Sequence, residues 1–196
     1  IYIKKNIPHA AGLGGSSSNA ASVIDALDLL YGTNLSYKEK FDIGLKIGCD
    51  VVFFFTSGTS LINGTGDKVY ERQPLPVYHV IIIKPDFGIC TKEAYASINP
   101  LKLNNKTDAE DLYTAYITND KEAIKKHSVN TFEEFTKQIE NIKSIKASLL
   151  ENDAVISLMT GSGSCVFGIF DEEHKSGQAY KNLSNTYNNI FKAKFI

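Results

Sequence analysis

The fold is decided by the stretch IPHAAGLGGSSSNAASVIDALDLLYG, residues 7–32. Its first part holds three glycines and three consecutive serines. Apolar residues then recur at helical spacing until Gly32 provides a stop: Ala20, Val23, Ile24, Leu27 and Leu30. Small residues let the backbone approach a ligand closely, and successive N–H groups at a helix N-terminus attract an anion. The stretch therefore predicts a phosphate site, with a helix-entry turn that binds no ligand as the alternative.

Composition and charge argue against several classes of protein. The chain has 196 residues, 43% of them hydrophobic, and a formal net charge of −1 with scattered Lys and Arg, so no basic stripe for nucleic acid is visible. Apolar runs such as 51–55 and 80–85 are too short to cross a bilayer. Three distant cysteines without a C-x-x-C pair argue against zinc and disulfides and favour a reducing compartment. We expect a cytoplasmic protein without a nucleic-acid or membrane partner.

The remaining elements alternate irregularly along the chain. Ser36 and Glu39 form a capping-box pattern that opens a helix ending at Gly48, and residues 57–66 indicate short strands broken by glycine turns. A buried strand is expected in 77–85, a short helix capped by Thr91, and three helical pieces within 108–151. Residues 154–171 predict strand, Gly/Ser turn and strand, followed by a helix near 173–184 and a last strand. This order favours an α+β fold over a doubly wound sheet.

The phosphate loop does not fit the two most familiar patterns. A Walker A loop requires a lysine after its last glycine, and none follows here. A dinucleotide-binding fingerprint requires a third glycine at the position that Ser17 occupies. Neither pattern therefore fits this loop.

The segment IPHAAGLGGSSSNAA resembles the P-x-G-x-G-L-[GS]-S-S motif of the GHMP kinases. Two later blocks, at 47–67 and 158–170, agree in order and spacing, and residues 84–95 match in character. Within the superfamily, the blocks resemble those of the 4-diphosphocytidyl-2-C-methyl-D-erythritol kinases. The resemblance implies a two-lobed α+β fold with the active site between the lobes. Residues 1–75 would form an incomplete N-terminal lobe and residues 76–196 the C-terminal lobe.

The resemblance also implies the chemistry. It assigns the catalytic base to Asp50, which the residues alone would equally allow as a helix-capping aspartate. ATP and Mg²⁺ are the implied cofactors, and the metal ligands stay open. The loop expected to bind the nucleotide consists of Pro8, His9, Ala10, Ala11, Gly12, Leu13, Gly14, Gly15, Ser16, Ser17 and Ser18. Residues expected near the phosphate or the substrate are Asn19, Thr91, Gly161, Ser162 and Gly163.

Three of these assignments have structural alternatives in the residues themselves. Ser16–Ser18 could contact phosphate oxygens or Mg²⁺, or could mainly cap the following helix. The TGSGS segment at 160–164 could be a plain hairpin turn, and Thr91 could act only as an N-cap. His9 stands where the family usually has Met and is interpreted as a loop residue that faces solvent or nucleotide.

The chain departs from the family pattern in several places. Ala10 replaces a usual Gly, which strains the loop if the position requires a positive φ. Ser16 also replaces a Gly, and Val52 replaces a Pro and so restores a backbone N–H. The family's upstream lysine and its aromatic cluster for cytosine have no counterpart, so we expect an incomplete N-terminal lobe and an inactive fragment.

The implied reaction is ATP-dependent phosphorylation of the 2-hydroxyl of a diphosphocytidyl sugar alcohol, by a monomer or homodimer. The alternatives are a GHMP kinase for homoserine, mevalonate or a sugar, and a truncated nucleotide-binding protein without catalysis.

Overall fold

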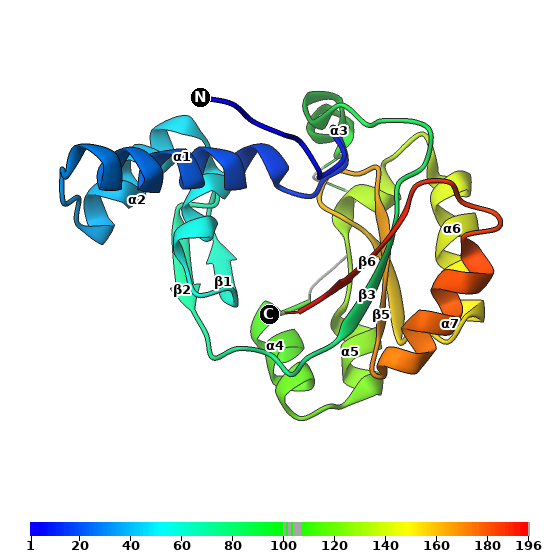
Figure 1. The fold of residues 1–196 in the computed structure, drawn as a ribbon. Helices are drawn as coiled ribbons and strands as arrows, with labels where there is room; N and C mark the ends of the chain where they lie inside the picture. The colour runs from blue at the N-terminus through cyan, green and yellow to red at the C-terminus, as the bar shows by residue number, and fades with distance from the viewer. Residues whose placement is uncertain (100, 102, 104–106, 196) are drawn as a thin grey trace. The chain divides into compact units, whose positions relative to one another are not determined.

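The computed structural model describes residues 1–99, 101, 103 and 107–195 (Figure 1). The chain forms two compact units: Ile1–Leu13 together with Leu75–Phe195, here called the large unit, and Gly14–Pro74, here called the small unit. Residues 1–13 thus pack with the C-terminal part of the chain. The lobe boundary at residue 75 stays a prediction.

The small unit begins with the predicted helices. α1 (Gly15–Tyr31) ends at Gly32, which adopts φ 60° as its C-cap. α2 (Tyr37–Ile47) is opened by the predicted capping box, in which Ser36 N–H donates to Glu39 Oε2 over 2.8 Å and the Ser36 hydroxyl accepts the Glu39 N–H. The 3₁₀ helix η1 (Cys49–Phe55) follows, and then β1 (Ser60–Asn63) and β2 (Lys68–Glu71) form an antiparallel hairpin.

The core of the small unit joins α1 to η1. Ala21, Ile24 and Val51 form its buried cluster, supported by Phe54 and Phe55. The periodicity of α1 predicts one continuous apolar face, but Leu27 and Leu30 are exposed, Leu30 by 74%. Of the residues of α1, the cluster contains Ala21 and Ile24 as buried members. The spacing of apolar residues therefore identifies the apolar face of α1, but not which parts of that face another element covers.

The large unit is built on a four-stranded sheet in the order β4-β5-β3-β6. Its strands are β3 (His79–Ile83), β4 (Ile156–Met159), β5 (Val166–Phe170) and β6 (Ile190–Lys194), and all neighbours are antiparallel. The helices α6 (Ile139–Glu151) and α7 (Glu173–Leu183) lie side by side on one face (Figure 1). They bury Ile142, Leu149 and Leu183 against Ile83 and Phe170, which forms the main core.

The other face of the sheet is covered by α4 (Ala109–Ile117) and α5 (Lys121–His127). Tyr116 and Ile124 pack there against Tyr78 and Ile169. Because side chains alternate along a strand, Ile169 faces this cluster while its neighbour Phe170 faces α6 and α7. Together with α6, these helices are the three pieces predicted within 108–151, and the α+β class is confirmed.

Two short elements complete the large unit. α3 (Thr91–Ser97) follows β3, and the 3₁₀ helix η3 (Thr131–Glu134) lies between α5 and α6. Within the described ranges, no helix is long and apolar enough to span a membrane.

Candidate active site

The first part of the predicted phosphate loop, Pro8–Leu13, belongs to the large unit. Ala10 adopts φ 51° and Gly12 φ 70°, both in the left-handed region. The position of Ala10 therefore does require a positive φ, so the alanine carries the strain that a glycine would avoid. Ala11 is buried, whereas His9 is exposed.

The Gly/Ser turn predicted between β4 and β5 is Thr160–Cys165, here called the Gly/Ser loop. Gly161 and Gly163 adopt φ 49° and 94°. A hydrogen bond from Gly163 N–H to Thr160 O, 2.8 Å long, stabilises the turn. Thr160 N–H donates to Cys165 O over 2.8 Å. Burial raises the pKa of the Cys165 thiol to about 11, so this cysteine stays protonated near neutral pH and is no nucleophile.

These two loops, far apart in the sequence, are hydrogen-bonded to each other. The Thr160 hydroxyl donates to the carbonyls of Gly12 and, at 3.3 Å, Ala11, and Cys165 N–H donates to Ala11 O over 3.2 Å. A Cβ on Gly12 would overlap the carbonyl oxygen of Thr160 and lie 2.7 Å from its Oγ1. Only glycine fits at position 12, both for this close approach and for its φ.

Thr91 is not the N-cap of α3, so that expectation is wrong. Cys90 occupies the cap position, no side chain caps the helix, and Thr91 is its first residue. The Thr91 hydroxyl lies 3.0 Å from the hydroxyl of Ser162 instead, which ties α3 to the Gly/Ser loop. A local capping rule cannot predict this contact, because Ser162 is 71 residues from Thr91 in the sequence.

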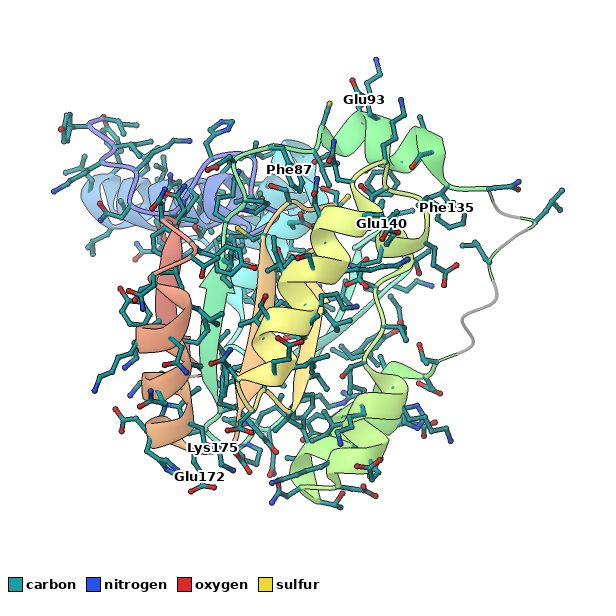
Figure 2. The ribbon with its side chains drawn as sticks, turned by 90° about the vertical axis from the view of Figure 1, so that its right-hand side faces the viewer. Phe87, Glu93, Phe135, Glu140, Glu172 and Lys175 are labelled. Carbon is teal, nitrogen blue, oxygen red and sulfur yellow. The ribbon has the colours of Figure 1, made fainter. Side chains whose placement is uncertain are left out.

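The loop also contacts the chain after β3. The Ser164 hydroxyl donates to Phe87 O over 2.6 Å, and the Lys84 ammonium donates to the same carbonyl over 2.8 Å and to Pro85 O over 2.6 Å. Figure 2 shows Phe87 at the same end of the large unit as Glu93 of α3 and Glu140 of α6, with Glu172 and Lys175 at the opposite end. The ion pairs of Asp171 with Lys121 and Lys175 therefore lie far from this loop and stabilise the other end of the sheet.

Sequence analysis missed two residues that hold the Gly/Ser loop. Asn130 Nδ2 donates to Met159 O over 2.7 Å and to Gly161 O over 2.8 Å. Glu133 Oε1 accepts from Met159 N–H over 2.6 Å. Asn130 followed three residues later by Glu133 is an N-cap pattern that the sequence displays. This local pattern does not indicate that Asn130 also contacts Met159 and Gly161, which are 29 and 31 residues away.

The second part of the phosphate loop starts α1 in the small unit. Gly14 is the N-cap with φ 64° and no side-chain cap hydrogen bond, so the serines do not cap the helix. Ser16–Ser18 lie inside its first turn, and the Ser18 hydroxyl donates to Gly15 O over 3.1 Å. The first N–H groups of a 17-residue helix are thus left to an external acceptor, at its positive end. Asn19 follows in the same helix.

Asp50 lies in the first turn of η1 with an exposed side chain. The cap position belongs to Gly48 and no side chain caps this turn, so the capping interpretation of Asp50 is wrong. Its neighbours Val51 and Val52 are buried, and Val51 belongs to the cluster that contains Ile24 of α1. A Cβ on Gly14 would lie 3.0 Å from Phe54 of η1, which shows how closely η1 packs at the start of α1. The carboxylate is therefore exposed on a firmly packed turn.

Two family models match the chain: "GHMP kinases N terminal domain" over residues 1–58 and "GHMP kinases C terminal" over residues 117–189. A 4-diphosphocytidyl-2-C-methyl-D-erythritol kinase of Clostridium tetani (strain Massachusetts / E88) is 36% identical over 197 aligned positions, which cover all of this chain and 70% of the relative. The chain belongs to the GHMP kinases. A kinase of the same name from Clostridium novyi (strain NT) is 36% identical to this GHMP kinase, over 99% of the chain and 70% of the relative.

Solved structures support the fold of this GHMP kinase. The crystal structure of a 4-(cytidine 5'-diphospho)-2C-methyl-D-erythritol kinase superposes with a TM-score of 0.82 at 24% identity, over 97% of this chain and 68% of that one. The family models and the curated relatives confirm the resemblance to the GHMP kinases, and the solved structure confirms the fold. The roles of Asp50, of loop 8–18 and of the Gly/Ser loop stay predictions.

Proposed function

We propose that this GHMP kinase transfers the γ-phosphoryl group of ATP to the 2-hydroxyl of 4-diphosphocytidyl-2-C-methyl-D-erythritol and releases ADP. The observation that carries the substrate is the identity of 36% to kinases named for it, over essentially the whole chain. ATP as donor follows from membership of the GHMP kinases.

The phosphates of ATP are assigned to loop 8–18. Its glycines leave the backbone accessible, and the N–H groups at the start of α1 are not occupied by a side-chain cap. In the first half of the loop, the carbonyls of Ala11 and Gly12 are held by Thr160 and Cys165. Since C=O and N–H of a trans peptide point in opposite directions, the N–H groups of Gly12 and Leu13 face away from those partners. These donors suit an anion.

Asp50 is assigned to the acceptor hydroxyl. Phosphoryl transfer to an alcohol requires a group that orients or deprotonates the attacking oxygen. Asp50 is exposed, has no side-chain partner among the residues that the structure describes, and lies on a turn fixed by buried Val51 and Val52, which fits that role. The Gly/Ser loop and Thr91 are assigned to the neighbourhood of the transferred phosphoryl group and the substrate.

Mg²⁺ is the expected metal, and when bound it would offset charge on the β- and γ-phosphates. Over the described residues, no three His, Cys, Asp or Glu side chains gather as ligands. Magnesium that acts on nucleotides is usually held by the phosphates together with one or two protein oxygens. The hydroxyls of Ser16 and Ser17 are not used for capping and are the candidate ligands.

The proposal has two competitors. A GHMP kinase for homoserine, mevalonate or a sugar would keep the same loops with another acceptor pocket. A nucleotide-binding protein without catalysis is favoured by one observation, the strained Ala10 within the loop. Cytoplasmic localisation belongs to the proposal as well, supported by three free thiols among the described residues. A monomeric or homodimeric state is also part of the proposal.

The test measures ADP release from Mg²⁺-ATP by the longest product that the gene encodes. Acceptors are 4-diphosphocytidyl-2-C-methyl-D-erythritol, homoserine, mevalonate and galactose. We expect turnover with the cytidyl substrate only, and a decrease in kcat of about 10²- to 10⁴-fold for Asp50→Asn. Turnover of another acceptor would overturn the substrate assignment, and ATP binding without turnover would overturn the kinase activity. Asp42→Asn, an exposed carboxylate on α2, is the matched control and should leave kcat unchanged.

A further inference from the structure

The side chain of Asn130 is divided between two tasks. Its Oδ1 accepts from Phe132 N–H over 2.9 Å and so caps η3. Its Nδ2 uses both protons on the Gly/Ser loop, toward Met159 O at 2.7 Å and Gly161 O at 2.8 Å. A cap requires only the oxygen. The two donated bonds therefore serve the loop and not the helix.

Glu133 supports the same segment from the other end of η3. Its Oε1 accepts from Met159 N–H over 2.6 Å, and its Oε2 pairs with the Lys146 ammonium of α6. The Glu133 side chain is only 13% exposed, so this pair is shielded and fixes η3 on α6. Since α6 is anchored in the main core, the loop is held by a rigid support.

The orientation of one peptide follows from these contacts. The carbonyl of Gly161 and the N–H of Ser162 belong to one planar trans peptide and point in opposite directions. With the carbonyl bound to Asn130, the Ser162 N–H points away from η3. Among the described residues this N–H has no backbone or side-chain acceptor. It is a free donor on the side of the loop that faces away from its support.

We propose that Asn130 is a positioning residue for phosphoryl transfer: it fixes the Gly161–Ser162 peptide so that the Ser162 N–H donates to an oxygen of the transferred phosphoryl group. The inference rests on the kinase function proposed above. It adds that this donor acts on charge that develops in the transition state, so losing its orientation lowers kcat more than affinity for Mg²⁺-ATP.

Asn130→Asp separates the two tasks of the side chain. Aspartate caps a helix as well as asparagine does, so η3 keeps its cap, but a carboxylate replaces the amide that faces two carbonyl oxygens. We expect kcat at pH 8 to decrease by about 10- to 100-fold, with the Kd for Mg²⁺-ATP changed less than threefold. The two carbonyls raise the pKa of the introduced carboxyl, and its protonated form can donate again, so kcat relative to wild type should recover as the pH falls from 8 to 6.

Asn141→Asp is the matched control, because Asn141 is an exposed amide on α6 that donates only to the Gln138 side chain, at 2.8 Å. Should Asn130→Asp fail to fold, Asn130→Ser keeps a capping oxygen and should show the decrease in kcat without recovery at low pH. Wild-type kcat in either variant, or a decrease independent of pH and matched by an equal increase in Kd, would overturn the inference. A wild-type enzyme inactive on every acceptor would refute the proposed function, and the inference with it.

Discussion

Gly12→Ala tests how closely Gly12 of the predicted phosphate loop packs against Thr160 of the Gly/Ser loop. The new Cβ would overlap the Thr160 carbonyl oxygen and lie 3.1 Å from Gly163 O, and both are backbone atoms that cannot rotate aside. The left-handed φ of 70° adds a penalty of about 1–2 kcal/mol for a non-glycine residue. Overpacking adds about 1–3 kcal/mol. The lower entropy of the unfolded chain returns about 0.4–1 kcal/mol.

The three terms together predict that Gly12→Ala lowers the free energy of unfolding by about 1–5 kcal/mol. The assay is urea unfolding followed by circular dichroism. Gly161→Ala is the matched control, because Gly161 also has a left-handed φ, 49°, but a Cβ there makes ordinary contacts, with Gly12 O at 3.4 Å and Gly12 Cα at 3.8 Å. The control should lose about 1 kcal/mol or less, from backbone strain alone. If both variants lose the same amount, the two loops do not pack as closely as described, and the reasoning is refuted.

Two further predictions concern stability. Ala10→Gly should raise the free energy of unfolding by up to about 1 kcal/mol, because relief of the left-handed strain at φ 51° outweighs the extra entropy of the unfolded chain. In the same urea assay, the control Ala147→Gly, inside α6, should lower the free energy of unfolding. A lower free energy of unfolding in Ala10→Gly would contradict the assigned strain. Burial raises the pKa of Tyr116 from 10.0 to about 12, so its contribution to stability is fully present below pH 10 and is lost as the pH rises to 12. The urea midpoint should therefore fall less steeply above pH 10 in Tyr116→Phe than in wild type. Tyr95 is exposed, so Tyr95→Phe is the control and should behave like wild type; equal slopes for the Tyr116 and Tyr95 variants would rule out the buried phenol as the cause.

Elements that depend on local chemistry could be predicted from the sequence. The capping box of Ser36 and Glu39 predicts the start of α2, and it forms as expected. The strand, Gly/Ser turn and strand at 154–171 appear as β4, the Gly/Ser loop and β5. Caps and turns are determined by residues within about four positions, which a single sequence displays directly.

Features that depend on distant partners could not be predicted. Thr91 has the residue type of an N-cap, yet its hydroxyl pairs with Ser162 across the large unit. Leu30 has the spacing of a core residue, yet it is exposed. Periodicity identifies the apolar face of a helix but does not indicate what packs against it. Asn130 could be identified as a cap of η3, but its second and more consequential role requires β4 and the Gly/Ser loop to lie beside η3.

One structural rule explains why some parts of the candidate site could be predicted from the sequence and others could not. Three of the side chains that fix its loops donate to backbone carbonyls: Thr160 to that of Gly12, Asn130 to that of Gly161, and Ser164 to that of Phe87. When carbonyls are held from inside the protein, the N–H groups of the same peptides point the opposite way. Peptides fixed in this manner present their N–H donors on the side away from the support, which suits a phosphate. The glycines that allow this geometry form a recognisable motif, whereas the residues that impose it are scattered along the chain. A motif therefore indicates where an anion binds, and the structure is required to show what orients the donors.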